Sequence, residues 1–169
     1  PAHPVELPRP PGRRLDRAGR ESGRHPGLTR REPPYTRRML AARADRVRAR
    51  MAEVGIDVLC LSVAPDLPYL TGYTAMPLER LTMLVLPRDG EATLVVPALE
   101  APRVVERPDV FTIRPWGETA DPVAIVADLV GTAGAVAVGD HTWARFVLDL
   151  QAALPAARFS KASAVTGPL

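Results

Sequence analysis

The amino-acid sequence predicts an α/β fold, a three-layer α/β/α sandwich whose mixed sheet contains one antiparallel hairpin. Three observations support this prediction. Segments with helical spacing of apolar residues alternate with short apolar runs, which is the pattern of a sheet covered by helices on both faces. Asp89 and Gly90 form a hairpin-turn signal between two of these runs. The 169 residues, 46% of them hydrophobic, suffice for one globular core.

The first 34 residues differ in composition from the rest of the chain. They contain eight Pro and eight Arg against four acidic residues, with only four large aliphatic side chains. Such a segment cannot bury enough apolar surface to offset the entropy lost on ordering it. We therefore predict a disordered Pro/Arg-rich tail at 1–34 and a folded domain at 35–169. The basic charge belongs to the tail, because 35–169 hold fourteen Lys and Arg against fifteen Asp and Glu.

The folded part is expected to begin with a helix between Thr36, a suitable N-cap, and Gly55, a suitable C-terminal stop. Apolar residues recur along it at spacings of three and four, at Leu40, Ala44, Val47, Met51 and Val54. This spacing places them on one face of a helix. Arginines occupy the opposite face, which we interpret as a solvated surface: Arg37, Arg43, Arg46, Arg48 and Arg50.

The elements that follow alternate between strand and helix. Strands are expected at 57–62, 82–86, 92–96, 110–114, 135–138 and 157–160. Helices are expected at 64–70, 97–106 and 121–130, the last with Asp121 as its cap and Pro122 at its first position. A loop is expected at 115–118. Asp140 or Thr142 is expected to cap a final helix that buries Trp143, Phe146, Val147, Leu150 and Leu154.

The folded part contains no recognisable catalytic centre. His141 is its only histidine, and we interpret Asp140-His141 as a surface turn, because no other His or Cys lies nearby in sequence. Cys60 lies within an expected strand, where burial makes a thiol inert. The glycine patterns of nucleotide-binding loops and the nucleophile elbow of hydrolases do not occur.

Composition also restricts the cellular context. Cys60 is the only cysteine, which excludes an internal disulfide and favours a reducing compartment. No run approaches the roughly 20 apolar residues of a membrane helix, and the N-terminus lacks the apolar region of a secretion signal. We expect a cytoplasmic protein with no membrane partner. The nearly neutral body predicts no nucleic-acid partner, although the Arg-rich tail and first helix leave nucleic-acid binding as an alternative.

One stretch of the sequence is similar to a known family. Gly55-Ile56-Asp57 leads into the apolar run at 58–62, and Tyr69-Leu70-Thr71-Gly72-Tyr73 follows. This order resembles the opening of the N-terminal domain of the creatinase, prolidase and aminopeptidase P family. The resemblance covers 36–169, through the hairpin at 89–90, the segments 95–97 and 115–117, and 150–163. The family commonly has Asn where this chain has Asp66, and both residues can cap a short helix.

The resemblance implies a ribonuclease H-like fold and a non-catalytic role. In that family a C-terminal pita-bread domain carries two Asp, one His and two Glu, which hold two divalent metal ions (Mn, Co or Zn). The metals activate water for attack on an Xaa-Pro bond. Those motifs do not occur in this sequence, so we expect the catalytic domain to be absent from this chain. The chain itself is expected to bind no cofactor and to hydrolyse nothing, whereas its parent protein would be a metal-dependent Xaa-Pro dipeptidase or aminopeptidase.

The resemblance also implies partners and site residues. Family N-terminal domains mediate subunit association and lend loop residues to the rim of an active site. The implied partners are the protein's own C-terminal catalytic domain, a second copy in a homodimer and, in the parent, a proline-containing peptide. Tyr73 and Arg80 are the candidate substrate-proximal or interface residues, because they bound an irregular loop beside an expected strand. A tyrosine can pack on a proline ring, and a guanidinium can pair with a peptide carboxylate.

Two further functions remain open at this point. The chain could be a stand-alone binding or assembly module, or the N-terminal domain of a creatinase-type amidinohydrolase. The coding sequence beyond Leu169 would discriminate among the three.

Overall fold

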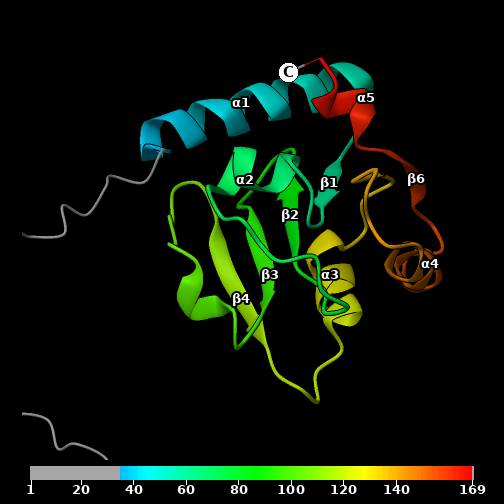
Figure 1. The fold of residues 1–169 in the computed structure, drawn as a ribbon. Coiled ribbons are helices and arrows are strands. Elements are labelled where there is room, and N and C mark those ends of the chain that lie inside the picture. Colours follow the sequence, from blue (N-terminus) through cyan, green and yellow to red (C-terminus); the bar gives the residue numbers. More distant parts are fainter. Residues whose placement is uncertain (1–34, 169) are drawn as a thin grey trace, which may run out of the picture. The chain divides into compact units, whose positions relative to one another are not determined.

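The computed structural model describes residues 35–168, so the predicted disordered tail at 1–34 lies outside the described residues. The helices are α1 (Arg37–Val54), α2 (Asp66–Thr71), α3 (Pro122–Val130), α4 (Ala144–Ala153) and α5 (Ser163–Thr166), with a 3-10 turn, η1 (Ala101–Arg103). The strands are β1 (Val58–Leu61), β2 (Met83–Pro87), β3 (Thr93–Pro97), β4 (Thr112–Trp116), β5 (Ala135–Val138) and β6 (Arg158–Lys161). Figure 1 shows their arrangement.

The strands form one mixed sheet in the order β4-β3-β2-β1-β5-β6. β2 runs antiparallel to both of its neighbours, β1 and β3, whereas the pairs β3–β4, β1–β5 and β5–β6 are parallel. The predicted mixed sheet and the antiparallel β2–β3 hairpin are therefore confirmed. Because β2 alone is reversed, its first residue lies at the sheet edge where the other five strands end.

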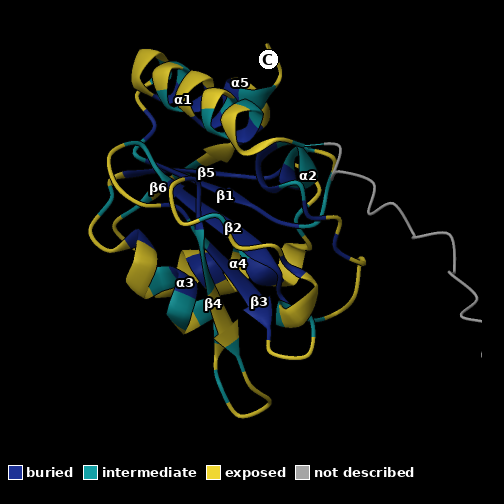
Figure 2. Cartoon of the chain, turned by 90° about the vertical axis from the view of Figure 1, so that its left-hand side faces the viewer, coloured by how far each residue is buried: buried dark blue, intermediate teal, exposed yellow. Residues whose placement is uncertain are grey.

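Helices cover both faces of the sheet, which confirms the three-layer sandwich. Side chains alternate along each strand, so Leu59 and Leu61 of β1 pack with α1, α2 and α5, while Val58 and Cys60 pack with α3 and α4. Figure 2 shows the buried strands between α1 and α5 on one side and α3 and α4 on the other. Full burial of each Leu or Val side chain contributes about 1.5–3 kcal/mol to folding.

Helix α1 has the expected boundaries and caps. Thr36 Oγ1 accepts a hydrogen bond from the backbone N–H of Met39, and Gly55 adopts the left-handed conformation with φ of 70°. Its buried face includes Leu40 and Val47, each with no exposed surface, as the spacing predicted.

Three arginines of α1, which were predicted to form a solvated surface, also make contacts within the domain. The Arg43 guanidinium stacks on the Tyr69 ring, 4.2 Å from its centroid, and donates to the Tyr69 carbonyl at 2.9 Å. Arg46 donates to the Tyr69 hydroxyl at 2.9 Å. Arg48 donates to the carbonyls of Pro87 at 3.3 Å and Gly90 at 2.8 Å. These three side chains therefore attach α1 to α2 and to the β2–β3 hairpin.

Two predicted elements in the middle of the chain are wrong in extent. The helix expected at 97–106 is only the 3-10 turn η1, because the backbone N–H of Ala98 donates to the Trp116 carbonyl and continues the pairing of β3 with β4. The strand expected at 110–114 lies at 112–116 and includes Pro115, which was expected in a loop. Proline is compatible with β4 because an edge strand needs no ladder hydrogen bond on its outer side.

Three local predictions about caps and burial are also wrong. The N-cap of α4 is Trp143, without a side-chain hydrogen bond, and its ring is 44% exposed rather than buried. Asp140 instead accepts hydrogen bonds from the N–H and hydroxyl of Ser163, at the start of the unpredicted helix α5. Asp66 begins α2 without capping it, and its carboxylate accepts from the hydroxyl of Thr166 at 3.2 Å.

Candidate functional site

The segment 73–82 lies at the sheet edge where β1, β3 and β4 end. It leaves α2 through Gly72 and enters β2 at Met83, the residue that pairs with Val95 of β3. The residues that follow β3 and β4 lie at the same edge. Ligands of open α/β sheets bind outside the carboxyl ends of strands, so this edge is the natural place for a site.

Tyr73 is buried against the core and reaches a pair of charged residues at the end of β3. Its hydroxyl donates to Glu100 Oε2 at 3.2 Å, and Arg103 Nη1 donates to the same oxygen at 2.9 Å. Burial raises the pKa of Tyr73, and the charge and hydrogen bond of Glu100 raise it further. The hydrogen bond from Arg103 lowers the pKa of Glu100 below its ordinary value. The tyrosine therefore stays protonated and the glutamate stays ionised near neutral pH.

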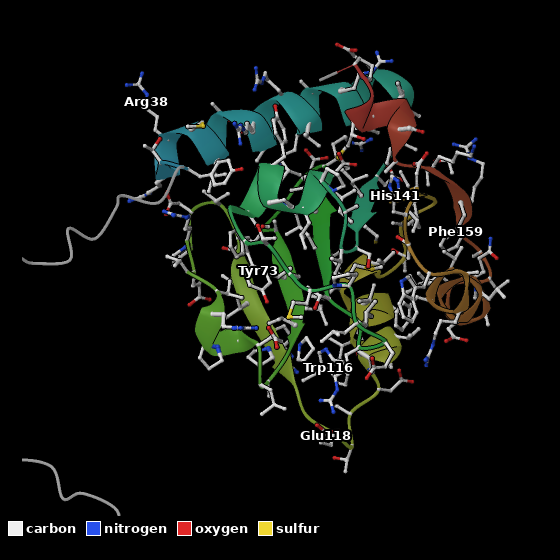
Figure 3. All side chains as sticks on the ribbon, in the orientation of Figure 1. Arg38, Tyr73, Trp116, Glu118, His141 and Phe159 are labelled. Carbon is white, nitrogen blue, oxygen red and sulfur yellow. The ribbon has the colours of Figure 1, made fainter. Side chains whose placement is uncertain are left out.

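Arg80, at the other end of the segment, is held by the loop after β4. Its two terminal nitrogens donate to the two carboxylate oxygens of Glu118, at 2.6 Å and 3.0 Å. The indole N–H of Trp116 donates to the Leu81 carbonyl at 2.9 Å and fixes the neighbouring backbone. Bidentate pairs of this kind orient a guanidinium in one plane. Figure 3 shows Trp116 and Glu118 on this side of the domain.

Tyr73 and Arg80 line one cavity of about 270 Å³. Its remaining wall is mainly apolar and includes Met76, Leu78 and Leu99, which are 56%, 41% and 75% exposed. We call these three side chains the apolar rim. Exposed apolar side chains that gather around a concave surface are typical of a contact site. The structure thus brings the two predicted site residues together, while their role beside a substrate or an interface stays a prediction.

Neither Cys60 nor His141 lines this cavity. Cys60 is fully buried in the sheet, and burial raises the pKa of its thiol to about 12, so it is not a nucleophile. His141 is exposed in a turn near β6, away from Tyr73 (Figure 3). Within residues 35–168, no three His, Cys, Asp or Glu side chains gather in a group that could hold a metal ion. In the same residues no helix is both long and apolar enough to cross a membrane.

Sequence reasoning missed the acidic partners of the two site residues. Glu100 lies 27 residues from Tyr73, and Glu118 lies 38 residues from Arg80. Glu118 was placed in the loop expected at 115–118, and Glu100 was placed inside a helix that does not form. A hairpin and a parallel edge strand bring both carboxylates to the segment, and only strand pairing could have indicated this.

Comparisons with known proteins agree with this architecture. Residues 43–168 match the model of the creatinase/prolidase N-terminal domain. Two mycobacterial proteins described as probable dipeptidase PepE, from Mycobacterium tuberculosis and Mycobacterium bovis, are 34% identical over 124 residues. That alignment covers 71% of this chain and 32% of the relatives, so the chain spans about a third of their length.

Solved structures are similar over the same part of the chain. Dipeptidase PepE from Mycobacterium ulcerans is 31% identical with a TM-score of 0.72, covering 80% of this chain and 37% of the other. The creatinase/prolidase N-terminal domain of a Streptococcus pyogenes X-Pro dipeptidase has a TM-score of 0.66 at 22% identity and shares the fold. The match covers 76% of this chain and 99% of that domain. The match to the family model over most of the residues shows that this chain belongs to the creatinase/prolidase N-terminal domain family.

Proposed function

We propose that this chain is the non-catalytic N-terminal domain of a metal-dependent Xaa-Pro peptidase, in which it associates subunits and shapes the substrate entrance. The family membership and the relatives described as dipeptidases support the peptidase class. The proposed partners are a catalytic domain of the same protein, a second copy in a homodimer, and a proline-containing peptide. The proposed compartment is the cytoplasm.

The observation that carries the proposal is the cavity between Tyr73 and Arg80 with its apolar rim. Exposed apolar side chains gathered around a concave surface favour a contact with another surface, which would cover them. The rim would pack against a partner, and the ordered guanidinium of Arg80 and hydroxyl of Tyr73 would face the space through which a peptide enters.

The proposal requires metal ligands from elsewhere. The two divalent ions expected of the parent need several carboxylates and a histidine close together, and the described residues contain no such group. These residues therefore do not fit the metal pair, and in the proposal the catalytic domain supplies its ligands.

The first experiment reads the coding sequence downstream of Leu169. We expect, within roughly 250 codons, the size of a large domain, two Asp, one His and two Glu in the order of the pita-bread fold. A stop codon close to Leu169 would contradict the proposal and favour a stand-alone assembly module. A catalytic domain with the residues of an amidinohydrolase would contradict the substrate class alone.

A second experiment tests association through the apolar rim. Sedimentation equilibrium of the 169-residue chain measures its self-association, with Leu99→Asp as the test variant. Leu148 on α4 is 64% exposed, comparable to Leu99, and lies outside the cavity, so Leu148→Asp is the matched control. We expect the dissociation constant to rise at least roughly tenfold for Leu99→Asp, because a charge is placed in an apolar contact. It should stay unchanged for the control. Equal effects of the two variants would contradict an interface at the rim.

A further inference from the structure

A second cavity, of about 390 Å³, lies on the other side of Tyr73. It shares Tyr73 and Met76 with the first cavity, but its charged residues are different: Arg103 and Arg107 line it, and no acidic side chain does. Two cations without a lining anion make the cavity electropositive, which attracts anions.

The acidic groups nearest to these arginines already have partners. The Glu100 carboxylate accepts from Arg103 and from the Tyr73 hydroxyl through one oxygen, Oε2. Asp109, close in sequence to Arg107, is ion-paired with Arg37, and the charge of Arg107 also lowers its pKa. Among the described residues, neither carboxylate forms an ion pair with Arg107 itself.

Arg107 has unsatisfied hydrogen-bond donors. Its Nη2 makes one long hydrogen bond, of 3.4 Å, to the Tyr35 carbonyl, and its Nε is buried without any acceptor. A buried charged donor without a partner is costly, and such an exception requires an explanation. Arg103 is 61% exposed and uses only Nη1 for Glu100, so its other donors are free to bind a ligand.

Part of the cavity wall is formed by a turn that favours glycine. Gly72 has φ of 70°, and a Cβ there would lie 3.3 Å from the Tyr35 ring. The turn carries the chain from α2 past the cavity, where Thr74 adds an exposed hydroxyl to the lining. The space beside the two guanidinium groups is thus bounded in part by this turn.

We propose that this cavity binds an oxyanion, a phosphate or a carboxylate group, between the guanidinium groups of Arg103 and Arg107. Planar guanidinium donors match both anions in a bidentate manner. The proposal does not depend on the peptidase assignment, because it uses only contacts within residues 35–168.

The test is a titration of the 169-residue chain with inorganic phosphate and, separately, with succinate, followed by amide NMR shifts at constant ionic strength. We expect saturable shifts of Gly72 and Thr74. The tighter of the two ligands identifies the anion class. Arg107→Gln should weaken binding roughly tenfold or more, since it removes one charge-assisted pair. Arg145→Gln, on α4 and outside the cavity, should leave it unchanged.

Two controls keep the result interpretable. Arg107→Lys keeps the charge but not the planar fork, so an intermediate affinity is expected. Thermal unfolding by circular dichroism establishes that each variant is folded before it is titrated. Non-saturable shifts, or equal affinities of the native chain and folded Arg107→Gln for both anions, would overturn the proposal.

Discussion

Replacing Asp57 by alanine should destabilise the domain more than any other exposed acidic substitution, because its carboxylate joins three strands. Its Oδ2 accepts from the backbone N–H groups of Gly134 and Ala135, at 3.1 Å and 3.0 Å, where β5 begins. Its Oδ1 is 3.2 Å from Arg88 Nη1, at the end of β2. One side chain before β1 thus fixes the start of β5 and the end of β2.

The magnitude follows from these contacts. A hydrogen bond to a charged group is worth about 1.5–3 kcal/mol when shielded, and the Asp57 side chain is 37% exposed, which lowers that figure. The exposed ion pair with Arg88 adds about 0–1 kcal/mol. We therefore expect Asp57→Ala to lower the free energy of unfolding by about 3 kcal/mol. Asp57→Asn, which keeps one acceptor oxygen and loses the charge, should lower it by about 1–2 kcal/mol.

Urea unfolding of the 169-residue chain, followed by circular dichroism, measures both values by linear extrapolation. Asp149→Ala, an exposed carboxylate on α4, is the control and should change stability by less than about 0.5 kcal/mol. If Asp57→Ala also stays within about 0.5 kcal/mol of the native chain, the carboxylate does not join the strands as described.

Three further predictions concern other groups. Cys60, whose thiol pKa burial raises to about 12, should resist alkylation at pH 8 in the folded chain and react in urea; reaction without urea would contradict its burial. Arg43→Lys should cost about 1–2 kcal/mol in urea unfolding, since lysine cannot both stack on Tyr69 and donate in its plane. Burial raises the pKa of Asp140, but hydrogen bonds from Ser163 and the charges of Lys161 and His141 together lower it by more, leaving it below its ordinary value. The contribution of Asp140 to the free energy of unfolding should therefore be present above the ordinary carboxyl pKa and lost as pH falls through the lower pKa of the folded state. In Asp140→Asn the free energy of unfolding should fall less steeply with decreasing pH. The same pH dependence of stability in the variant and the native chain would contradict this prediction.

The sequence predicted the position of five strands well: the four buried on both faces, and the largely exposed β6, which lies at 158–161 against the expected 157–160. β1, β2, β3 and β5 appear as apolar runs between polar residues, and each lies within two residues of its expected position. β4 was displaced because Pro115 was taken as its end, whereas an edge strand accepts proline. The helix at 97–106 failed because pairing with β4 overrides local propensity.

The candidate site was predictable only in part, because strand pairing also decides which residues meet there. Tyr73 and Arg80 stand out because an irregular segment beside a strand is a usual place for functional residues. Their partners Glu100 and Glu118 could not be assigned, since the pairings depend on which strands become neighbours. Asp57 was noted only as part of a family motif, and its contacts with the turn before β5 span 77 and 78 residues.

The arginines show why charge in a sequence does not locate a binding surface. Arg43 and Arg48 belong to a helix face that looks as basic as any patch for an anionic partner, yet their donors are used by carbonyls of this domain. Arg107 lies close to Glu106 and Asp109 in the sequence, where nothing marks it, yet its Nε is buried without an acceptor. Binding capacity depends on donors left unsatisfied after folding, and Arg107 keeps such a donor at the carboxyl edge of the sheet, beside the apolar rim.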